Sequence, residues 1–279
     1  MYRSVEIVNP QGLSLVDGLV MVARARRKGQ IMTEYLKTSK GRRLAYKKTE
    51  GKQPCIVFLG GLKSDMEGTK AIWLEDWATA NGYAFLRFDY SGHGESSGAF
   101  EDGSIADWHE DTLEAVSELT RGKLIVVGSS MGGWQALLLA REVPDRVAGL
   151  VTIAAAPDFT EDGYWAEFDD AQKAQIEAGQ PVFLPSDYME PYVVTKKMIE
   201  DGRRCLVLRG ELDLPMPTRF LQGTADTAVS TETALKLLDH ASCPDMRLTL
   251  VKGADHRFSD EDCLALIGAS VKEVIERAL

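Results

Sequence analysis

Short apolar runs and amphipathic segments alternate along most of the chain, and this alternation predicts strands separated by helices. Apolar runs of strand length occur at 55–59, 84–88, 124–127, 147–153 and 247–251. Apolar residues at helical spacing occur at 69–81, 104–120, 135–142, 230–239 and 262–279. Polar and apolar residues alternate over 33–49, which predicts an antiparallel hairpin at the sheet edge. Together these elements predict an α/β fold with a mostly parallel central sheet and helices on both faces.

One segment, 158–204, interrupts this rhythm because it is rich in charged, aromatic and proline residues and contains no long apolar strand run. An insertion of this size in a compact α/β protein commonly forms a lid over a site. Its aromatic residues are Phe159, Tyr164, Trp165, Phe168, Phe183, Tyr188 and Tyr192. Two interpretations are open: the rings line a pocket for an acyl or aryl group, or they only pack the lid onto the body.

Composition narrows the class of protein. The chain has 279 residues, 44% of them hydrophobic, which suffices for one large core. The net charge of −10 argues against nucleic acid or an anionic membrane as a partner. The four cysteines show no C-x-x-C spacing, so buried free thiols in a reducing compartment are expected. No apolar run approaches the roughly 20 residues of a membrane span.

The N-terminal segment, 1–31, is interpreted as an extension that precedes the folded domain over 32–279. It is either disordered, upstream of a working start at Met32, or a basic targeting segment. Glu6 and Asp17 fit poorly with a transit peptide, which is normally poor in acidic residues. We therefore expect a cytoplasmic protein, with a mitochondrial location as the alternative if this segment is a transit peptide.

The candidate chemistry centres on Gly128-Ser129-Ser130-Met131-Gly132, which follows a predicted buried strand and precedes a predicted helix. G-x-S-x-G in this context is a nucleophile elbow, and its register selects Ser130 as the nucleophile. The alternative is an ordinary turn with an incidental serine. The glycine-rich loop after 55–59 predicts the second oxyanion donor, so we assign the backbone amides of Leu62 and Met131 to an oxyanion hole. The alternative is a glycine-rich βα turn that binds no ligand.

A base and an acid for this serine are sought further along the chain. Among the four histidines only His256 follows a predicted strand near the C-terminus, so it is the expected general base. Two strand-like runs end near an aspartate, at Asp213 and at Asp226. Asp226 is preferred because one helix and one strand separate it from the histidine loop, which places acid and base on neighbouring strand ends.

A further loop, 89–98, is dense in small residues but carries no nucleotide signature. It lacks the lysine of a P-loop and does not open directly onto a helix, so nucleotide binding has little support. His93 is expected to form a hydrogen bond within this loop.

Three segments carry a resemblance to a known family. The chain resembles the α/β-hydrolase superfamily from about residue 40 onward. More narrowly, residues 60–71 (GGLKSDMEGTKA), 87–98 (RFDYSGHGESSG) and 128–134 (GSSMGGW) resemble the palmitoyl-protein thioesterase and acyl-glucuronide esterase branch of animal mitochondria and its bacterial relatives. The resemblance implies a serine hydrolase that cleaves esters or thioesters, with Ser130, Asp226 and His256 in the matching positions.

This assignment implies two-step acyl transfer through an acyl-enzyme, and it needs neither a metal nor an organic cofactor. The expected partner is an ester or thioester substrate, either a small molecule or an acylated protein. Carbon–carbon bond hydrolases and peptidases use the same machinery, so they remain alternatives, as does a non-catalytic binding protein with the same fold.

Overall fold

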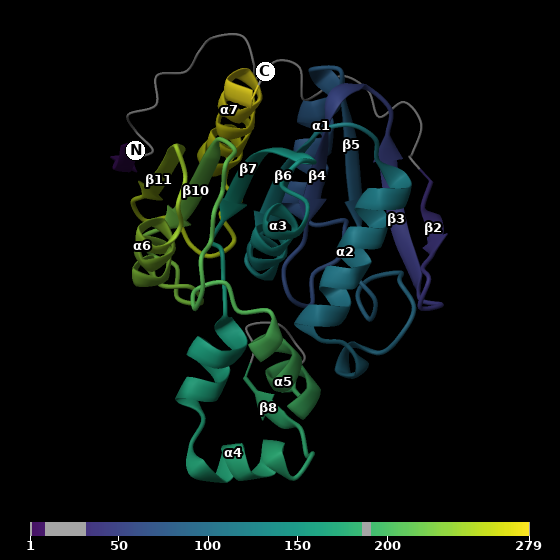
Figure 1. The fold of residues 1–279 in the computed structure, drawn as a ribbon, viewed down its shortest axis with the longest axis vertical. Coiled ribbons are helices and arrows are strands. Elements are labelled where there is room, and N and C mark those ends of the chain that lie inside the picture. The colour runs from purple at the N-terminus through teal and green to yellow at the C-terminus, as the bar shows by residue number, and fades with distance from the viewer. Residues whose placement is uncertain (1, 9–31, 186–190, 279) are drawn as a thin grey trace.

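The computed structural model describes residues 2–8, 32–185 and 191–278, and within these ranges the main sheet has nine strands (Figure 1). The strands of the main sheet are β1 (Tyr2–Val8), β2 (Glu34–Lys37), β3 (Arg43–Thr49), β4 (Lys52–Leu59), β5 (Tyr83–Phe88), β6 (Leu124–Ser129), β7 (Val147–Ile153), β10 (Thr218–Gly223) and β11 (Asp245–Val251). The helices around it are α1 (Thr69–Ala80), α2 (Ile105–Leu119), α3 (Met131–Glu142), α6 (Thr231–His240) and α7 (Glu261–Ala278), with the 3-10 turn η2 (Phe100–Asp102) before α2. The predicted α/β fold class is confirmed.

The strand order is β1-β11-β10-β7-β6-β4-β5-β3-β2. All neighbours pair in parallel except at one edge, where β3 pairs antiparallel with both β2 and β5. The predicted edge hairpin is therefore confirmed. Because β6 lies between β4 and β7, the loops that follow these three strands meet at the same edge of the sheet.

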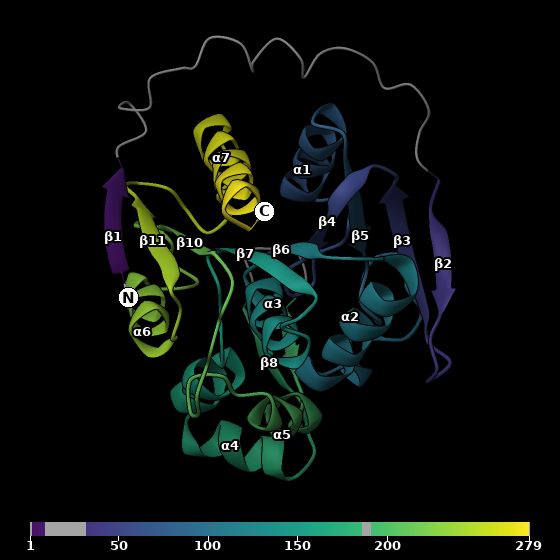
Figure 2. The same cartoon turned by 45° about the horizontal axis from the view of Figure 1, so that its top comes forward.

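The two faces of the sheet are buried by different helices. Figure 2 shows α1 and α7 on one face and α2, α3 and α6 on the other. Strand β4 illustrates why: Ile56 and Phe58 belong to the cluster under α1 and α7, whereas Val57 and Leu59 belong to the opposite cluster. A strand buried on both faces needs a continuous apolar run, which is the pattern seen at 55–59.

The insertion after β7 forms a separate lobe below the carboxyl ends of the strands (Figure 1). Its elements are the π-helical turn η3 (Thr160–Trp165), α4 (Asp170–Glu177), the antiparallel strands β8 (Val182–Leu184) and β9 (Tyr192–Val194), and α5 (Lys196–Arg204). At its base Asp158, with a φ of 58°, accepts hydrogen bonds from the backbone amides of Val207 and Leu208. One buried carboxylate thus joins the two ends of the lobe.

The same contact corrects one prediction. The apolar run ending at Asp213 is not a strand of the main sheet, and Asp213 forms only an isolated bridge with Ser242. Val207 and Leu208 are buried as the run predicts, but their amides donate to the Asp158 carboxylate and so cannot join a strand ladder.

Part of the N-terminal segment is ordered as a strand. A disordered extension is one reading of 1–31, but Tyr2–Val8 forms β1 and pairs in parallel with β11 along its whole length. Residues 9–31 lie outside the described residues. Among the described residues, none of the helices combines the length and the apolar composition of a membrane span.

Candidate active site

Ser130 occupies the sharp turn between β6 and α3. Its backbone has φ 56° and ψ −119°, a conformation that a non-glycine residue adopts only where the surrounding structure enforces it. A Cβ atom on Gly132 would lie 2.0 Å from the carbonyl oxygen of Leu59, and one on Gly128 would lie 2.1 Å from that of Gly132. The two glycines of the motif are therefore required by close backbone packing, as an elbow needs.

The structure brings the predicted serine, histidine and aspartate together. His256 Nε2 lies 3.1 Å from Ser130 Oγ, and His256 Nδ1 lies 2.8 Å from Asp226 Oδ2. The Asp226 side chain is fully buried, whereas the His256 side chain is 28% exposed. Asp226 follows β10, and His256 follows the neighbouring strand β11, so their loops lie side by side. This arrangement can carry a proton from the serine to the imidazole.

The Asp226 carboxylate is fixed on both oxygens. Oδ1 accepts hydrogen bonds from the amides of Ala228 and Val229, and Oδ2 also accepts one from Gln222 Nε2. Burial raises the pKa of Asp226, but the hydrogen bonds from His256 and from the two amides outweigh it and keep the pKa below its usual value. The carboxylate is therefore ionised at neutral pH. Gln222 is not predicted from the sequence. The one feature that could have indicated it is a polar residue at the otherwise apolar end of a strand.

Leu62 and Met131 belong to two segments that pass next to the serine. Met131 begins α3 directly after Ser130, and Leu62 lies in the loop after β4. A Cβ on Gly61 would lie 3.4 Å from Ser130 Cβ, so this loop passes next to the nucleophile. In the described part of the chain, neither amide donates to a protein oxygen. Both N–H groups are thus available to an anionic oxygen near Ser130.

The loop that carries Leu62 is held in place by hydrogen bonds to residues at the end of β5. Asp89 Oδ1 accepts a hydrogen bond from the Met66 amide at 2.6 Å, and Arg87 donates one to the Met66 carbonyl at 2.6 Å. Burial raises the pKa of Asp89 to about 6. In the next loop His93 Nδ1 lies 3.1 Å from the carbonyl oxygen of Ser91, which confirms the expected hydrogen bond within that loop.

Aromatic residues of the lobe form a chain of ring contacts that starts at Trp134 on α3, the helix that follows Ser130. Trp134 contacts Phe159 edge to face, Phe159 contacts Tyr164 in the same way, and Tyr164 stacks on Phe168. These contacts favour the packing interpretation for the three lid rings. Phe183 is 60% exposed, and Tyr188 lies outside the described residues.

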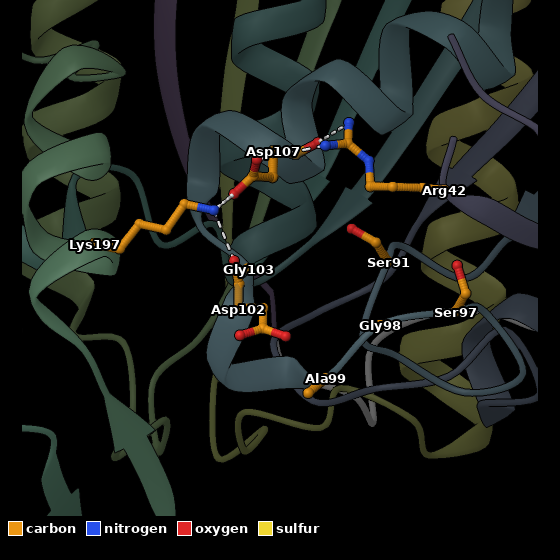
Figure 3. A pocket seen from close by; sticks show the side chains of 9 residues that line it. All are labelled: Arg42, Ser91, Ser97, Gly98, Ala99, Asp102, Gly103, Asp107 and Lys197. Carbon is orange, nitrogen blue, oxygen red and sulfur yellow. Dashed lines mark hydrogen bonds and ion pairs between the residues drawn. The ribbon is translucent and has the colours of Figure 1, made fainter. Parts of the chain in front are cut away.

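A pocket of about 230 Å³ lies at another junction between this lobe and the body (Figure 3). Its lining comes from loop 91–103, the start of α2, Arg42 and Lys197 of α5. Lys197 donates to the carboxylate of Asp107 and to the carbonyl of Asp102, and Arg42 also contacts Asp107. Ser130, Asp226 and His256 do not line this pocket. The junction therefore fixes the lid to the body and is separate from the candidate catalytic group.

Comparison with known proteins agrees with the fold. A family model described as the α/β hydrolase fold matches residues 54–193. The chain belongs to this family and is a hydrolase.

A narrower similarity follows. The chain is 33% identical to the mitochondrial palmitoyl-protein thioesterase ABHD10 of Bos taurus, covering 84% of this chain and 77% of the relative. The human protein of the same name is also 33% identical, with 84% and 77% covered. Among solved structures, α/β hydrolase domain-containing protein 10 from mouse has 31% identity and a TM-score of 0.82, covering 89% and 100%. A protein from Agrobacterium vitis S4 has 38% identity and a TM-score of 0.84, covering 88% and 100%.

Proposed function

We propose that this chain is a serine hydrolase that cleaves carboxylic esters or thioesters, of the acyl-protein or acyl-glucuronide type, through an acyl-enzyme. The observation that carries the proposal is the hydrogen-bonded chain from Ser130 Oγ through His256 to Asp226. The mammalian relatives named palmitoyl-protein thioesterase support a thioester as the scissile bond. A role for each residue follows from the distances.

In the first step His256 Nε2 removes the proton of Ser130 while Oγ attacks the substrate carbonyl. The negative charge that develops on the carbonyl oxygen is stabilised by the amides of Leu62 and Met131. Asp226, ionised and hydrogen-bonded to Nδ1, keeps the proton on that nitrogen and stabilises the imidazolium. His256 then returns its proton to the departing thiol or alcohol, and an acyl-serine ester remains.

In the second step water takes the place of the leaving group. His256 removes a proton from this water, which attacks the acyl-serine carbonyl, and the same two amides stabilise the oxyanion. Collapse of this intermediate releases the carboxylic acid and restores the serine hydroxyl. The His256 side chain is partly exposed and so has the access to solvent that this step requires.

The names of the relatives bear on where the protein acts. The mammalian thioesterases are named as mitochondrial, which supports the mitochondrial alternative for this chain and gives no support to the cytoplasmic prediction. Import of residues 1–279 into isolated mitochondria, followed by protease treatment, tests this location. Protection of the chain supports the alternative, and full digestion opposes it.

The test of the proposed activity is hydrolysis of p-nitrophenyl esters and acyl-CoA thioesters with acyl chains from two to sixteen carbons. Activity that rises toward long chains and disappears in Ser130→Ala supports a deacylase. Ser130-dependent activity restricted to short or aryl acyl groups keeps the serine hydrolase but contradicts long-chain thioesters as its substrates.

A further inference from the structure

Lys70 stands in an unfavourable place for a lysine. It lies in the first turn of α1, the helix that follows the loop carrying Leu62. The cap residue Gly68 provides no side-chain hydrogen bond, and the first turn contains no acidic residue. The N-terminal end of a helix carries a partial positive charge, so a cation there opposes the helix dipole. Lys70 therefore destabilises the N-terminal end of α1.

Burial adds a second cost. Lys70 is half-buried, and desolvation lowers the pKa of its ammonium, although the charge of Asp255 raises it. Within the described ranges Lys70 takes part in no ion pair. Its Nζ donates instead to the backbone carbonyl of Arg257, the residue directly after His256, at 2.5 Å. Residues that break local preferences without local compensation are commonly found where function requires them.

The other contacts of the loop that follows β11 and carries His256 show what this hydrogen bond adds to the position of the loop. On the side of the acid, the Gly253 amide donates to Thr224 Oγ1 and the Ala225 amide donates to the Ala254 carbonyl. These bonds place the loop relative to Asp226. Toward α1, Phe258 is fully buried in the apolar cluster under that helix. Apolar packing is not directional, whereas the Lys70 hydrogen bond is a directional polar contact that fixes the loop relative to α1.

We propose that Lys70 is a positioning residue, which holds His256 in register with the loop that carries the Leu62 amide by binding the Arg257 carbonyl. The inference rests on the proposed function, because it assigns to Lys70 the alignment of the base with the oxyanion hole. Such alignment matters more in the transition state than in the bound substrate, so its loss lowers kcat and leaves KM nearly unchanged.

The test compares Lys70→Met, which keeps a long apolar stem but loses the donor, with Lys70→Arg, which keeps a donor and the charge. Lys123→Met is the matched control, because Lys123 also donates to a backbone carbonyl, that of Asp145, at the opposite end of β6. With a p-nitrophenyl ester, Lys70→Met is expected to lower kcat by about 10- to 100-fold with KM within about threefold. Lys70→Arg is expected to restore most of kcat, and Lys123→Met to leave it unchanged.

Several outcomes overturn the proposal. Wild-type kcat in Lys70→Met does so, and so does a loss that Lys70→Arg fails to recover or a change confined to KM. If Lys70→Met does not fold, Lys70→Gln, with a neutral and shorter side chain, must show the same loss of kcat in folded protein. Activity that survives in Ser130→Ala refutes the proposed function itself, whereas wild-type kcat in Lys70→Met with inactive Ser130→Ala refutes only the role of Lys70.

Discussion

Replacing Asp226 with asparagine tests the geometry of the site most sharply, because the structure dictates how the new amide must lie. In the native protein Oδ1 accepts hydrogen bonds from the amides of Ala228 and Val229. The asparagine oxygen must keep this position, since an NH2 group there would face two donors. The NH2 group is then placed at the position of Oδ2, where it faces His256 Nδ1 and Gln222 Nε2.

The consequence for the base follows from its tautomers. Facing a donor, His256 Nδ1 gives up its proton and becomes an acceptor, so the proton moves to Nε2. An imidazole protonated at Nε2 cannot remove the Ser130 proton across the 3.1 Å that separates them. In serine hydrolases such a change costs about 10^4 in kcat. This corresponds to about 5.4 kcal/mol of transition-state stabilisation.

The assay is steady-state hydrolysis of a p-nitrophenyl ester by folded Asp226→Asn, with Asp213→Asn as the matched control. Asp213 ends the other run that could have supplied the acid, and it bridges only to Ser242. We expect Asp213→Asn to retain wild-type kcat. A loss below about tenfold in Asp226→Asn, or an equal loss in both variants, would refute the assigned role of Asp226.

Two predictions concern stability. The pKa of Asp89 in the folded state is raised to about 6, so the native state binds the carboxyl proton more tightly than the unfolded chain does. The contribution of this group to the free energy of unfolding is therefore fully present below about pH 4 and is lost as the pH rises through 6. The loss is at most about 3 kcal/mol in urea unfolding, and a slope unchanged in Asp89→Asn would contradict it. Asp158→Ala leaves two buried amides, of Val207 and Leu208, without an acceptor and is expected to lower the free energy of unfolding by about 2 to 4 kcal/mol. A urea-unfolding change below about 1 kcal/mol would show that this carboxylate does not join the ends of the lid.

The sequence predicts those parts of the site whose causes are local. The elbow is readable because Gly128 and Gly132 flank Ser130 in the same short motif, and close packing leaves no room for a side chain at either glycine. The order of elements also predicts that Asp226 meets His256, since the ends of neighbouring parallel strands lie together.

Contacts between distant segments escape this reasoning. Lys70 donates to the Arg257 carbonyl across 187 residues of sequence, and the Val207 amide donates to Asp158 across 49. In the sequence these residues are only a lysine in a helix and an aspartate after a strand. The run ending at Asp213 is wrongly predicted as a strand for the same reason. Its apolar residues indicate burial, but the amides of Val207 and Leu208 donate to the Asp158 carboxylate and not to a neighbouring strand.

The pairing of β1 with β11 is a further long-range contact that no local sequence pattern predicts. It adds Tyr2–Val8 to the sheet next to the strand that precedes the histidine loop. The alternation of apolar residues describes which elements form, whereas the edge at which a terminal strand joins depends on the whole sheet.

The proposed function depends on attack of Ser130 on an acyl carbonyl, with His256 as its base. The most direct measurement is the rate of hydrolysis of palmitoyl-CoA and p-nitrophenyl esters by the wild-type protein and by Ser130→Ala, with intact-protein mass spectrometry of the quenched reaction. We expect that Ser130→Ala loses at least about 10^3-fold in kcat and that the wild-type chain carries one acyl group on Ser130. Ordinary turnover by Ser130→Ala, or an acyl group on another residue, would contradict it.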